Sequence, residues 1–452
     1  MMSPLSVARW LSTSRPADTP VAWRGEQVWT LGQLRDDVAR YVERLQQQQG
    51  QRWALCFDDS YLLLVALLAT LHAHKTPVIP GHSRLSQLEE QRALFDGVLS
   101  DKPLGWSGPT WVISSSQRPR AQAVTFRELA DDASIELFTS GSTGQPKRII
   151  KSLAGLDREA ELLVTRFADR LAGCRIVASV APQHLYGLTF RIFLPMALGL
   201  PLHAAMLNYA EQLSALDPRH RYAFISSPAF LKRLDLRLTP PPVAILFSAG
   251  GALPWEQVTQ AADWLQCWPD EIYGSTETGI LAWRRREQEH GDWRPFPGVR
   301  FLREGEAFRV FSPLIAGRDG LLLDDTLQFT ADGHFRLTGR RGRVVKIEEK
   351  RISLSEIEQR LLALEGICDA VALPVSRGGR QGIGVLLVLN DHTRQQWQSA
   401  NKTLERAWRQ ALRPTLEPVA IPRYWRIIDE IPVNSMNKRV YAQLQELFHE
   451  TP

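Results

Sequence analysis

The chain has 452 residues, of which 44% are hydrophobic and 23% are charged, and its formal net charge is +5. This length is too great for one ordinary core and predicts two or three domains, while the composition is typical of a soluble globular protein and excludes a mainly disordered chain. The four cysteines lie far apart and form no CxxC pair, which argues against a disulfide framework or a zinc site and fits a reducing cytoplasm.

The N-terminal part of the chain gives no sign of secretion or of a membrane anchor. Its first residues lack a continuous apolar stretch of signal-peptide length. The apolar run at 61–74 is too short to span a bilayer and predicts a buried helix. We therefore expect a cytoplasmic protein that does not insert into a membrane.

Short β-rich runs alternate with helical patterns through the middle of the chain. The runs at 175–182, 223–228 and 243–251 are typical of strands, and the segment 157–171 has the period of an amphipathic helix. Alternation of this kind predicts an α/β fold with parallel strands. We expect a large N-terminal domain of α/β subdomains with parallel-rich sheets, followed by a small α+β C-terminal domain.

The sequence GRRGR at 339–343 indicates where the two domains meet. It follows a strand-like run and precedes a strand and a turn that lead into an amphipathic helix, with Ser353 or Ser355 as the expected N-cap. We place the boundary at about residue 340. The predicted domains are therefore 1–339 and 340–452.

The basic residues are concentrated in the C-terminal part of the chain. From His334 onward there are 19 Lys and Arg against 13 Asp and Glu. These basic residues alternate with acidic and apolar ones and form no dense patch, which disfavours a nucleic-acid partner. An acidic partner protein or a polyphosphate substrate is favoured instead.

The stretch FTSGSTGQPK at 138–147 is rich in small and hydroxylated residues and ends in Lys147. Small residues let the backbone turn tightly and point several N–H groups and hydroxyls into one concavity, which suits an oligophosphate. No GK[ST] follows at the Walker spacing, so this is not a Walker loop. By itself, such a stretch is also compatible with a solvent-exposed linker.

Together with later segments, this loop resembles the phosphate-binding loop of the adenylate-forming superfamily. That superfamily contains acyl-CoA synthetases, aryl-acid ligases, peptide-synthetase adenylation domains and luciferases. The later segments that resemble it are FSAGGALP at 247–254, IYGSTETG at 272–279, DDTLQFTADGHFRLTGR at 324–340, KRISLSEIE at 350–358 and IPVNSMNKRVY at 431–441. The whole chain is most similar to the acid:carrier-protein ligases of bacterial aryl polyene and related pigment clusters.

The resemblance implies a site for ATP and Mg²⁺. Thr276 would contact the α-phosphate, Glu277 would ligate Mg²⁺, and Tyr273 would stack on the adenine. Asp325 would hold the ribose, with the neighbouring Asp324 as the alternative. The phosphate loop would comprise Thr139, Ser140, Gly141, Ser142, Thr143, Gly144 and Lys147. The remaining expected nucleotide contacts are Gly250, Gly251, Ala252, Gly274, Ser275 and Arg340.

The expected catalytic residues are Thr276, Glu277 and Lys438. Lys438 corresponds to the family's catalytic lysine on a small mobile C-terminal domain, which rotates between the two half-reactions.

Three positions, Gly342, Glu349 and Asn437, depart from the family pattern. Glycine at the hinge position still tolerates the backbone rotation that a hinge must absorb. Glu349 stands where a loop beside the route of the pantetheine arm usually carries glycine. A glutamate there would disfavour the phosphates of free CoA more than the neutral stem of a carrier-borne arm.

The acid would lie against the segment at 181–195, which resembles the family's aromatic gate. The expected pocket residues are His184, Tyr186, Phe190, Ser248 and Gly279. His184 is equally compatible with a structural histidine beneath the loop. Relatives that activate amino acids place an aspartate in this segment, and none occurs between Ala181 and Phe190, so an amino acid is disfavoured.

These features predict an ATP-dependent acid–thiol ligase. It would form an acyl-AMP from an aryl acid such as a hydroxybenzoate and transfer the acyl group to the phosphopantetheine thiol of an acyl carrier protein. One alternative is an acyl-CoA synthetase that uses free CoA with an aryl or fatty acid. Another is a degenerate, non-catalytic protein that binds a nucleotide or docks a carrier.

Overall fold

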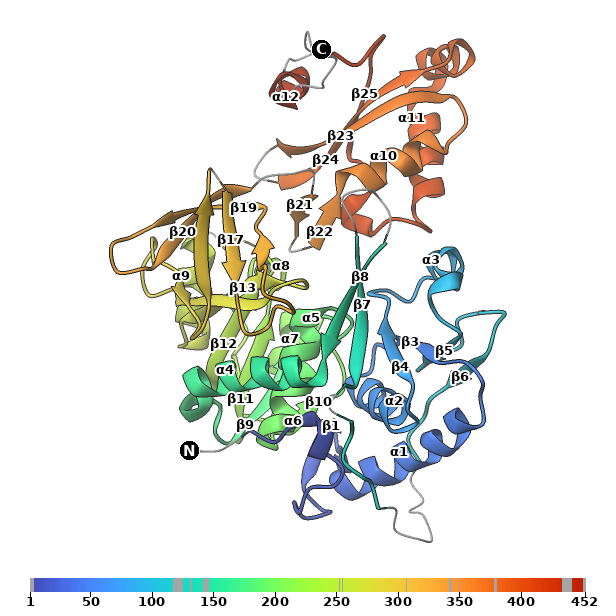
Figure 1. The fold of residues 1–452 in the computed structure, drawn as a ribbon. Coiled ribbons are helices and arrows are strands. Elements are labelled where there is room, and N and C mark those ends of the chain that lie inside the picture. The colour runs from blue at the N-terminus through green and yellow to red at the C-terminus, as the bar shows by residue number, and fades with distance from the viewer. Residues whose placement is uncertain are drawn as a thin grey trace. The chain divides into compact units, whose positions relative to one another are not determined.

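The fold is described from a computed structural model of the chain. The residues described are 4–116, 125–130, 132–140, 146–251, 253, 255–305, 307–340, 344–348, 350–377, 380–432 and 441–449. The chain forms two compact units (Figure 1). The first comprises Met1–Thr139 and Arg148–Arg341, and the second comprises Ser140–Lys147 and Gly342–Pro452.

A nine-stranded sheet forms one half of the first unit. Its order is β15-β14-β13-β12-β11-β9-β10-β1-β2, and the inner pairs from β1 to β13 are parallel, whereas β2, β14 and β15 are antiparallel to their neighbours. The strands are β1 (Pro20–Arg24), β2 (Gln27–Thr30), β9 (Cys174–Ala178), β10 (Leu202–His203), β11 (Arg221–Ser226), β12 (Val243–Ala249), β13 (Pro269–Ser275), β14 (Gly279–Arg285) and β15 (Arg294–Pro295).

A six-stranded sheet, ordered β6-β5-β3-β4-β7-β8, forms the other half. Its strands from β6 to β7 pair in parallel. They are β3 (Arg52–Cys56), β4 (Thr76–Ile79), β5 (Gly97–Ser100), β6 (Thr110–Val112), β7 (Ser134–Ser140) and β8 (Pro146–Ser152). The predicted α/β fold with parallel-rich sheets is therefore confirmed.

Helices cover these sheets, and side chains cap several of them. Asp59 accepts a hydrogen bond from the Leu62 amide at the start of α2, and Ser152 does the same for Gly155 at the start of α4. The helices and turns are η1 (Val7–Arg9), α1 (Leu31–Gln46), α2 (Ser60–His72), α3 (Leu85–Glu90), η2 (Arg92–Leu94), α4 (Leu153–Leu171), α5 (Leu185–Leu188), the π-helical turn η3 (Thr189–Phe193), α6 (Leu194–Leu198), α7 (Ala210–Ser214), α8 (Pro228–Leu231) and α9 (Trp255–Leu265).

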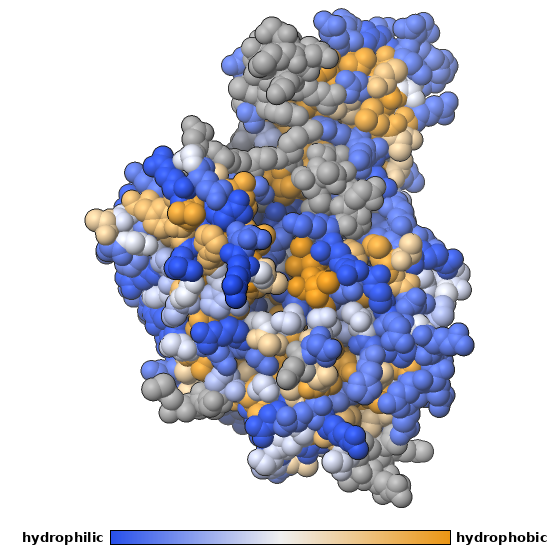
Figure 2. All heavy atoms as spheres, viewed as in Figure 1, coloured by the Kyte–Doolittle hydropathy of each residue, from blue (hydrophilic) through white to orange (hydrophobic). Residues whose placement is uncertain are grey.

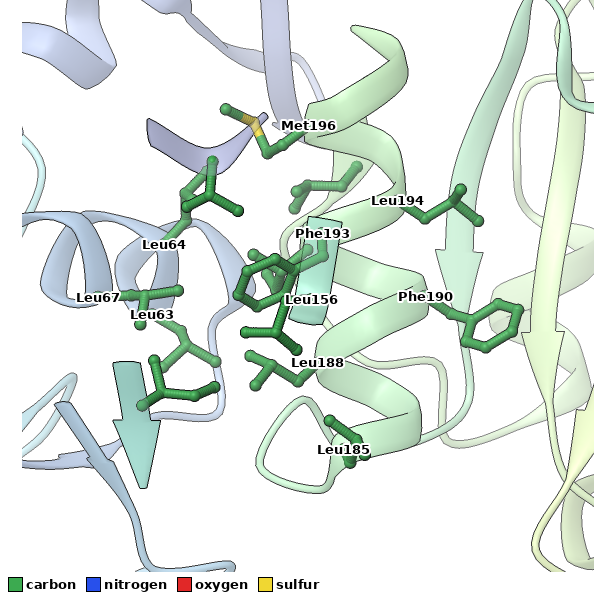
Figure 3. Close-up of a cluster of buried hydrophobic side chains, with 14 of the residues drawn as sticks. Leu63, Leu64, Leu67, Leu156, Leu185, Leu188, Phe190, Phe193, Leu194 and Met196 are labelled. Atoms are coloured by element: carbon green, nitrogen blue, oxygen red, sulfur yellow. The ribbon is translucent and has the colours of Figure 1, made fainter. Parts of the chain in front are cut away.

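One hydrophobic core joins the two sheets. Helix α2 is buried on nearly all sides, and Leu63 and Leu67 point from it toward Leu188 and Phe193 of the helix that contains η3, as Figure 3 shows. All four side chains are fully buried. Each contributes about 2 kcal/mol by leaving water. The buried helix that the sequence predicts at 61–74 is thus confirmed as α2.

Two small antiparallel sheets complete the first unit. One contains β16 (Arg300–Glu304), β17 (Ala307–Phe311) and β18 (Leu321–Leu322), and the other is the hairpin of β19 (Asp325–Phe329) and β20 (Phe335–Arg340). Hydrophilic side chains cover much of the face seen in Figure 2. Within the described residues, no helix has the length and apolar character needed to cross a membrane.

The second unit has its own core on both faces of a three-stranded sheet. The predicted strand and helix near 344–362 are present, and Ser353 caps the helix by accepting from the Glu356 amide, whereas Ser355 lies inside it. The elements are β21 (Val344–Ile347), β22 (Lys350–Ser353), α10 (Leu354–Leu362), β23 (Ile367–Arg377), β24 (Arg380–Leu389), α11 (Asp391–Leu412), η4 (Pro418–Ala420), β25 (Tyr424–Ile427) and α12 (Tyr441–His449).

Candidate functional site

The candidate site lies at the carboxyl ends of two neighbouring parallel strands. Ala249 at the end of β12 lies opposite Ile272 of β13. Gly250 and Gly251 follow β12, and the loop at 275–279 follows β13, so both segments leave the same edge of the nine-stranded sheet. Open parallel sheets bind ligands at this edge. The fold therefore brings together two of the predicted nucleotide-binding segments.

The 275–279 loop is closed by reciprocal hydrogen bonds. The Ser275 amide donates to Thr278 Oγ1 at 3.0 Å, and the Thr278 amide donates to Ser275 Oγ at 3.2 Å. A β-carbon on Gly274 would lie 2.2 Å from the Gly279 carbonyl oxygen, so only glycine fits before this turn. Between the two anchors lie the half-buried residues Thr276 and Glu277. The predicted phosphate and metal contacts thus sit at the tip of a fixed loop.

A second contact joins residues that are far apart in the sequence. Tyr273 Oη donates to Asp325 Oδ2 at 2.9 Å. Asp325 is half-buried and lies opposite Arg340 across the β19–β20 hairpin, whereas Asp324 is exposed. The Tyr273 ring packs against Trp293, with ring centroids 5.7 Å apart. Of the two aspartates proposed for the ribose, Asp325 is the one that lies beside the expected adenine residue.

The expected acid-pocket residues at 184–190, from the N-cap of α5 into η3, differ in exposure. His184 is exposed, whereas Phe190 is fully buried. The Phe190 ring packs against Tyr186 at 4.8 Å and against Phe247 at 4.9 Å. Tyr186 Oη donates to the Ser226 carbonyl at 3.2 Å, and burial raises the pKa of this phenol well above its usual value, so the hydroxyl stays neutral. The three rings form a fixed aromatic wall.

Serine hydroxyls lie at the same sheet edge as this wall. Ser179 and Ser226 share a hydrogen bond of 2.9 Å between their hydroxyl oxygens. Ser248 is 1% exposed, and within the described residues its Oγ has no hydrogen-bond partner. A buried hydroxyl without a partner is costly unless a ligand or water satisfies it. Gly279, the last expected pocket residue, is the first residue of β14 and adopts φ = 68°.

The described residues fit a nucleotide in two respects. Buried hydroxyl oxygens without a hydrogen-bond partner in the described part of the chain occur at Thr139, at the end of β7, as well as at Ser248. Gly250 adopts φ = 98°, which favours glycine and leaves the backbone open to a close approach. These features suit ligand hydroxyl or phosphate groups.

A magnesium ion would rely on one carboxylate. The described residues contain no group of three or more His, Cys, Asp or Glu side chains that could hold a metal. Mg²⁺ commonly binds through one or two carboxylates together with substrate phosphates and water. Glu277 fits that arrangement as the protein ligand.

Several predicted residues lie outside the described residues or are described only in part. Outside the described residues are Gly141, Ser142, Thr143, Gly144, Ala252, Gly342, Glu349, Asn437 and Lys438. The side chains of Ser140 and Arg340 are also not described. Lys147 is described as exposed and belongs to the second unit. The roles expected of these residues remain predictions.

Two buried charged residues at this site were missed by the sequence prediction. Lys151 donates to the carbonyl oxygen of Glu277, and Glu159 accepts from the Ile280 amide. A signal for Glu159 was present, because it occupies a core-facing position of α4 between Leu156 and Leu163. Lys151 gave no comparable signal, since nothing in the run KRIIKS shows which of its side chains are buried.

Comparison with known proteins supports this interpretation of the fold. The family model described as AMP-binding enzyme matches residues 85–302. The 4-coumarate–CoA ligase of Halorhodospira halophila is 28% identical over 334 residues, covering 69% of this chain and 77% of that protein. The chain is also similar to the N-benzoylphenylalaninol synthetase apmA of Penicillium brevicompactum, at 23% identity over 421 residues. The matched region covers 81% of this chain but only 18% of that longer protein.

A solved structure extends the likeness to nearly the whole chain. The o-succinylbenzoate CoA synthetase (MenE) of Bacillus subtilis, bound to a product analogue, has a TM-score of 0.81. The match covers 97% of this chain and 98% of that one, at 17% identity. This likeness shows a shared fold.

Proposed function

We propose that this chain is an enzyme of the AMP-binding adenylate-forming superfamily and that it activates a carboxylic acid in two steps. The acid reacts with ATP to give an acyl-AMP and pyrophosphate. The phosphopantetheine thiol of an acyl carrier protein then takes the acyl group and releases AMP. The contact between Tyr273 and Asp325 carries the proposal, because it joins two separately predicted nucleotide residues in one site.

The first step needs stabilised negative charge at phosphorus. A carboxylate oxygen attacks the α-phosphorus, and the bond to the bridging oxygen of pyrophosphate breaks. Charge increases on the equatorial oxygens, where positioned hydroxyls and cations stabilise it. Thr276 would supply a hydroxyl, and Mg²⁺ held by Glu277 would polarise phosphate oxygens. Lys147 and Lys438 would add ammonium groups.

Replacing Asp325 by asparagine is expected to raise the KM for ATP roughly tenfold. Asparagine keeps an acceptor for Tyr273 but loses the charge that strengthens hydrogen bonds from the ribose hydroxyls, each worth about 1.5–3 kcal/mol. ATP-dependent pyrophosphate exchange measures the effect. Asp324→Asn is the matched control, because Asp324 is adjacent and exposed. An equal effect of the two substitutions would remove Asp325 from the ribose site.

The aromatic wall favours an aryl acid. Tyr186 is the half-buried ring of the wall. Behind it lie the fully buried rings of Phe190, which is tilted against Tyr186, and Phe247, which packs edge to face with Phe190. Flat rings pack well against such a wall, whereas a long acyl chain needs a deeper channel. The likeness to a 4-coumarate–CoA ligase agrees with this preference. A hydroxybenzoate would also offer a group for the Ser248 hydroxyl.

A pyrophosphate-exchange screen over aryl and fatty acids tests the proposed activity. We expect exchange with one or more hydroxylated benzoates or cinnamates and little with acids of twelve or more carbons. Phe190→Ala should shift activity toward longer acids. Exchange with fatty acids alone, or with no acid, would contradict the aryl-acid assignment.

A basic stripe on α11 supports a carrier protein as the acceptor. Lys402, Arg406, Arg409 and Arg413 fall within about 60° of one another at 3.6 residues per turn. Lys402, Arg406 and the C-cap residue Arg413 are exposed, whereas Arg409 is half-buried and pairs with Glu405 at 3.2 Å. Carrier proteins are generally acidic around the serine that bears their pantetheine arm. Opposite charges on exposed surfaces mainly accelerate association.

Transfer to a cognate carrier protein is therefore expected to slow steeply as salt rises. Charges on exposed surfaces are screened over about 8 Å at physiological ionic strength. Lys402→Glu with Arg406→Glu should raise the KM for carrier protein roughly tenfold without changing pyrophosphate exchange. Lys232→Glu, at an exposed position of the first unit, is the control for the charge change.

Free CoA is the second candidate acceptor, and the likeness to a CoA ligase favours it. Free CoA has no acidic protein surface for the basic stripe to attract. The KM for CoA should therefore change little when charges on α11 are reversed. Measuring both acceptors side by side decides between them. If CoA is acylated as efficiently as carrier protein, the acyl-CoA synthetase assignment replaces the carrier assignment.

A further inference from the structure

We propose that Lys151 and Glu159 are positioning residues for adenylation, and that Glu159 couples the expected acid pocket to the loop expected to bind ATP. The proposal rests on the proposed function, because it assigns roles to residues around the 275–279 loop. Neither residue belongs to the segments from which the sequence predicts a site. Both lie in the first unit, on β8 and α4.

Lys151 fixes the main chain at the expected magnesium ligand. Its side chain is almost completely buried, and Nζ donates to the Glu277 carbonyl oxygen at 3.1 Å. Burial lowers the pKa of this ammonium group, and the nearby carboxylates of Glu159 and Glu277 oppose that shift. A buried ammonium is retained only where acceptors and opposite charges compensate its lost hydration. Lys151 therefore fixes the main chain of the loop at the residue expected to bind the metal.

Glu159 uses its two oxygens on two different elements. Oε1 accepts from the Ile280 amide at 2.9 Å, and Oε2 accepts from Thr189 Oγ1 at 2.9 Å. A β-carbon on Gly279 would lie 2.9 Å from Oε1, so this close approach depends on glycine. A buried carboxylate with both oxygens bonded is held in one geometry. Glu159 thereby joins the end of the loop to the first residue of η3.

The contact at Thr189 reaches the aromatic wall. Thr189 begins the π-helical turn η3 and directly precedes Phe190, whose ring packs against Tyr186. Single π-helical turns occur frequently at functional sites. Because protein interiors are close-packed, a displacement of the wall is transmitted through Thr189 and Glu159 to the loop. Binding of the acid would thus adjust the loop that holds ATP.

If Lys151 had a purely structural role, its replacement would have different effects, and Lys75 serves as the comparison. Lys75 is also buried and donates to main-chain carbonyl oxygens, those of Gln48 and Gly50, but it contacts none of the predicted site residues. If Lys151 only stabilised the fold, replacing either lysine would lower the melting temperature and leave the kinetics alone. A positioning role adds a loss of kcat at Lys151.

The first test compares Lys151→Met with Lys75→Met in pyrophosphate exchange. We expect both variants to lower Tm, and only Lys151→Met to lower kcat, by roughly ten- to a hundredfold, with the KM for the acid nearly unchanged. Lys151→Arg should recover part of kcat, because it restores a donor and a charge. A kcat for Lys151→Met equal to that of Lys75→Met overturns the positioning role.

The second test measures the link between acid and nucleotide. The Kd for the acid is determined by calorimetry with and without a nonhydrolysable ATP analogue, and the ratio reports the coupling. We expect Thr189→Val to bring the ratio close to one, whereas Glu159→Gln, which can still bond both partners, keeps part of it. Thr70→Val is the control, since Thr70 is buried and bonds the Ala66 carbonyl within α2. A ratio preserved in Thr189→Val, or equal to one in the wild type, overturns the link.

The two failures can be told apart. If the wild-type chain exchanges no pyrophosphate with any acid, the proposed function is wrong and the positioning role falls with it. If the wild type is active and Lys151→Met and Thr189→Val behave like their controls, only the further inference is wrong.

Discussion

Replacing Lys438 by alanine is expected to lower the rate of acyl-AMP formation by roughly two or more orders of magnitude. That is the scale of loss when a positioned group that stabilises transition-state charge is removed. In the rotating-domain model, Lys438 would reach the α-phosphate and carboxylate oxygens only in the first half-reaction, because the C-terminal domain would rotate before the second. Transfer from a supplied acyl-AMP to the thiol acceptor should therefore survive.

Single-turnover measurements of each half-reaction check whether Lys438→Ala slows only the first. Arg439→Ala is a convenient control, because it removes a neighbouring positive charge. Equal damage to both steps would contradict the rotating-domain model. Absence of both steps in the wild-type chain would favour the non-catalytic alternative, which the departures at Gly342, Glu349 and Asn437 left open.

The architecture was predictable because its signals are local. Strands expected at 175–182, 223–228 and 243–251 are present as β9, β11 and β12, and the expected helix at 157–171 lies within α4. Alternation of apolar strands and amphipathic helices already selects parallel sheets. The motif likewise indicated the glycine at 274. The structure adds the reason, because a β-carbon there would collide with the carbonyl oxygen of Gly279.

The contacts that assemble the site were less predictable, because they depend on register and packing between distant segments. The resemblance proposed Tyr273 and Asp325 separately, but their hydrogen bond spans 52 positions and requires β13 and the β19–β20 hairpin to meet. Phe190, which was expected to line the pocket, is fully buried against Phe247, a depth that the sequence did not indicate, and its role in the pocket stays a prediction. An amphipathic pattern shows which face is buried but not how deep each ring lies.

Charged residues in the core are the hardest to interpret from sequence. Lys151 sits in the run KRIIKS, where it could equally face solvent, and only the position of β8 directs it to Glu277. Glu159 interrupts an apolar face, which indicates a buried partner without identifying it. The structure shows two partners of Glu159, the Ile280 amide and the Thr189 hydroxyl. These contacts connect Glu159 to two segments of the predicted site.

Replacing Glu277 by glutamine is expected to reduce Mg²⁺-dependent pyrophosphate exchange by about 100-fold or more while leaving the fold intact. The side chain keeps its size and a carbonyl oxygen but loses the negative charge that a hard divalent ion requires. Without a bound cation, the negative charge that develops on the phosphate oxygens in the transition state is stabilised less. Removing one group that stabilises such charge typically lowers kcat by this factor. The exchange rate is measured against Mg²⁺ concentration.

The dependence on Mg²⁺ distinguishes a lost metal ligand from a distorted loop. The main-chain contact of Glu277 with Lys151 does not involve the carboxylate, so Glu277→Gln should keep the loop closed and the melting temperature close to that of the wild type. Excess Mg²⁺ should then recover part of the exchange rate, because weaker binding is offset by mass action. Glu161→Gln, on α4 and outside the predicted site segments, is the matched control and should behave as the wild type. Unchanged exchange in Glu277→Gln would remove Glu277 from the metal site, and a loss that no Mg²⁺ concentration reduces would assign it a role other than holding the ion.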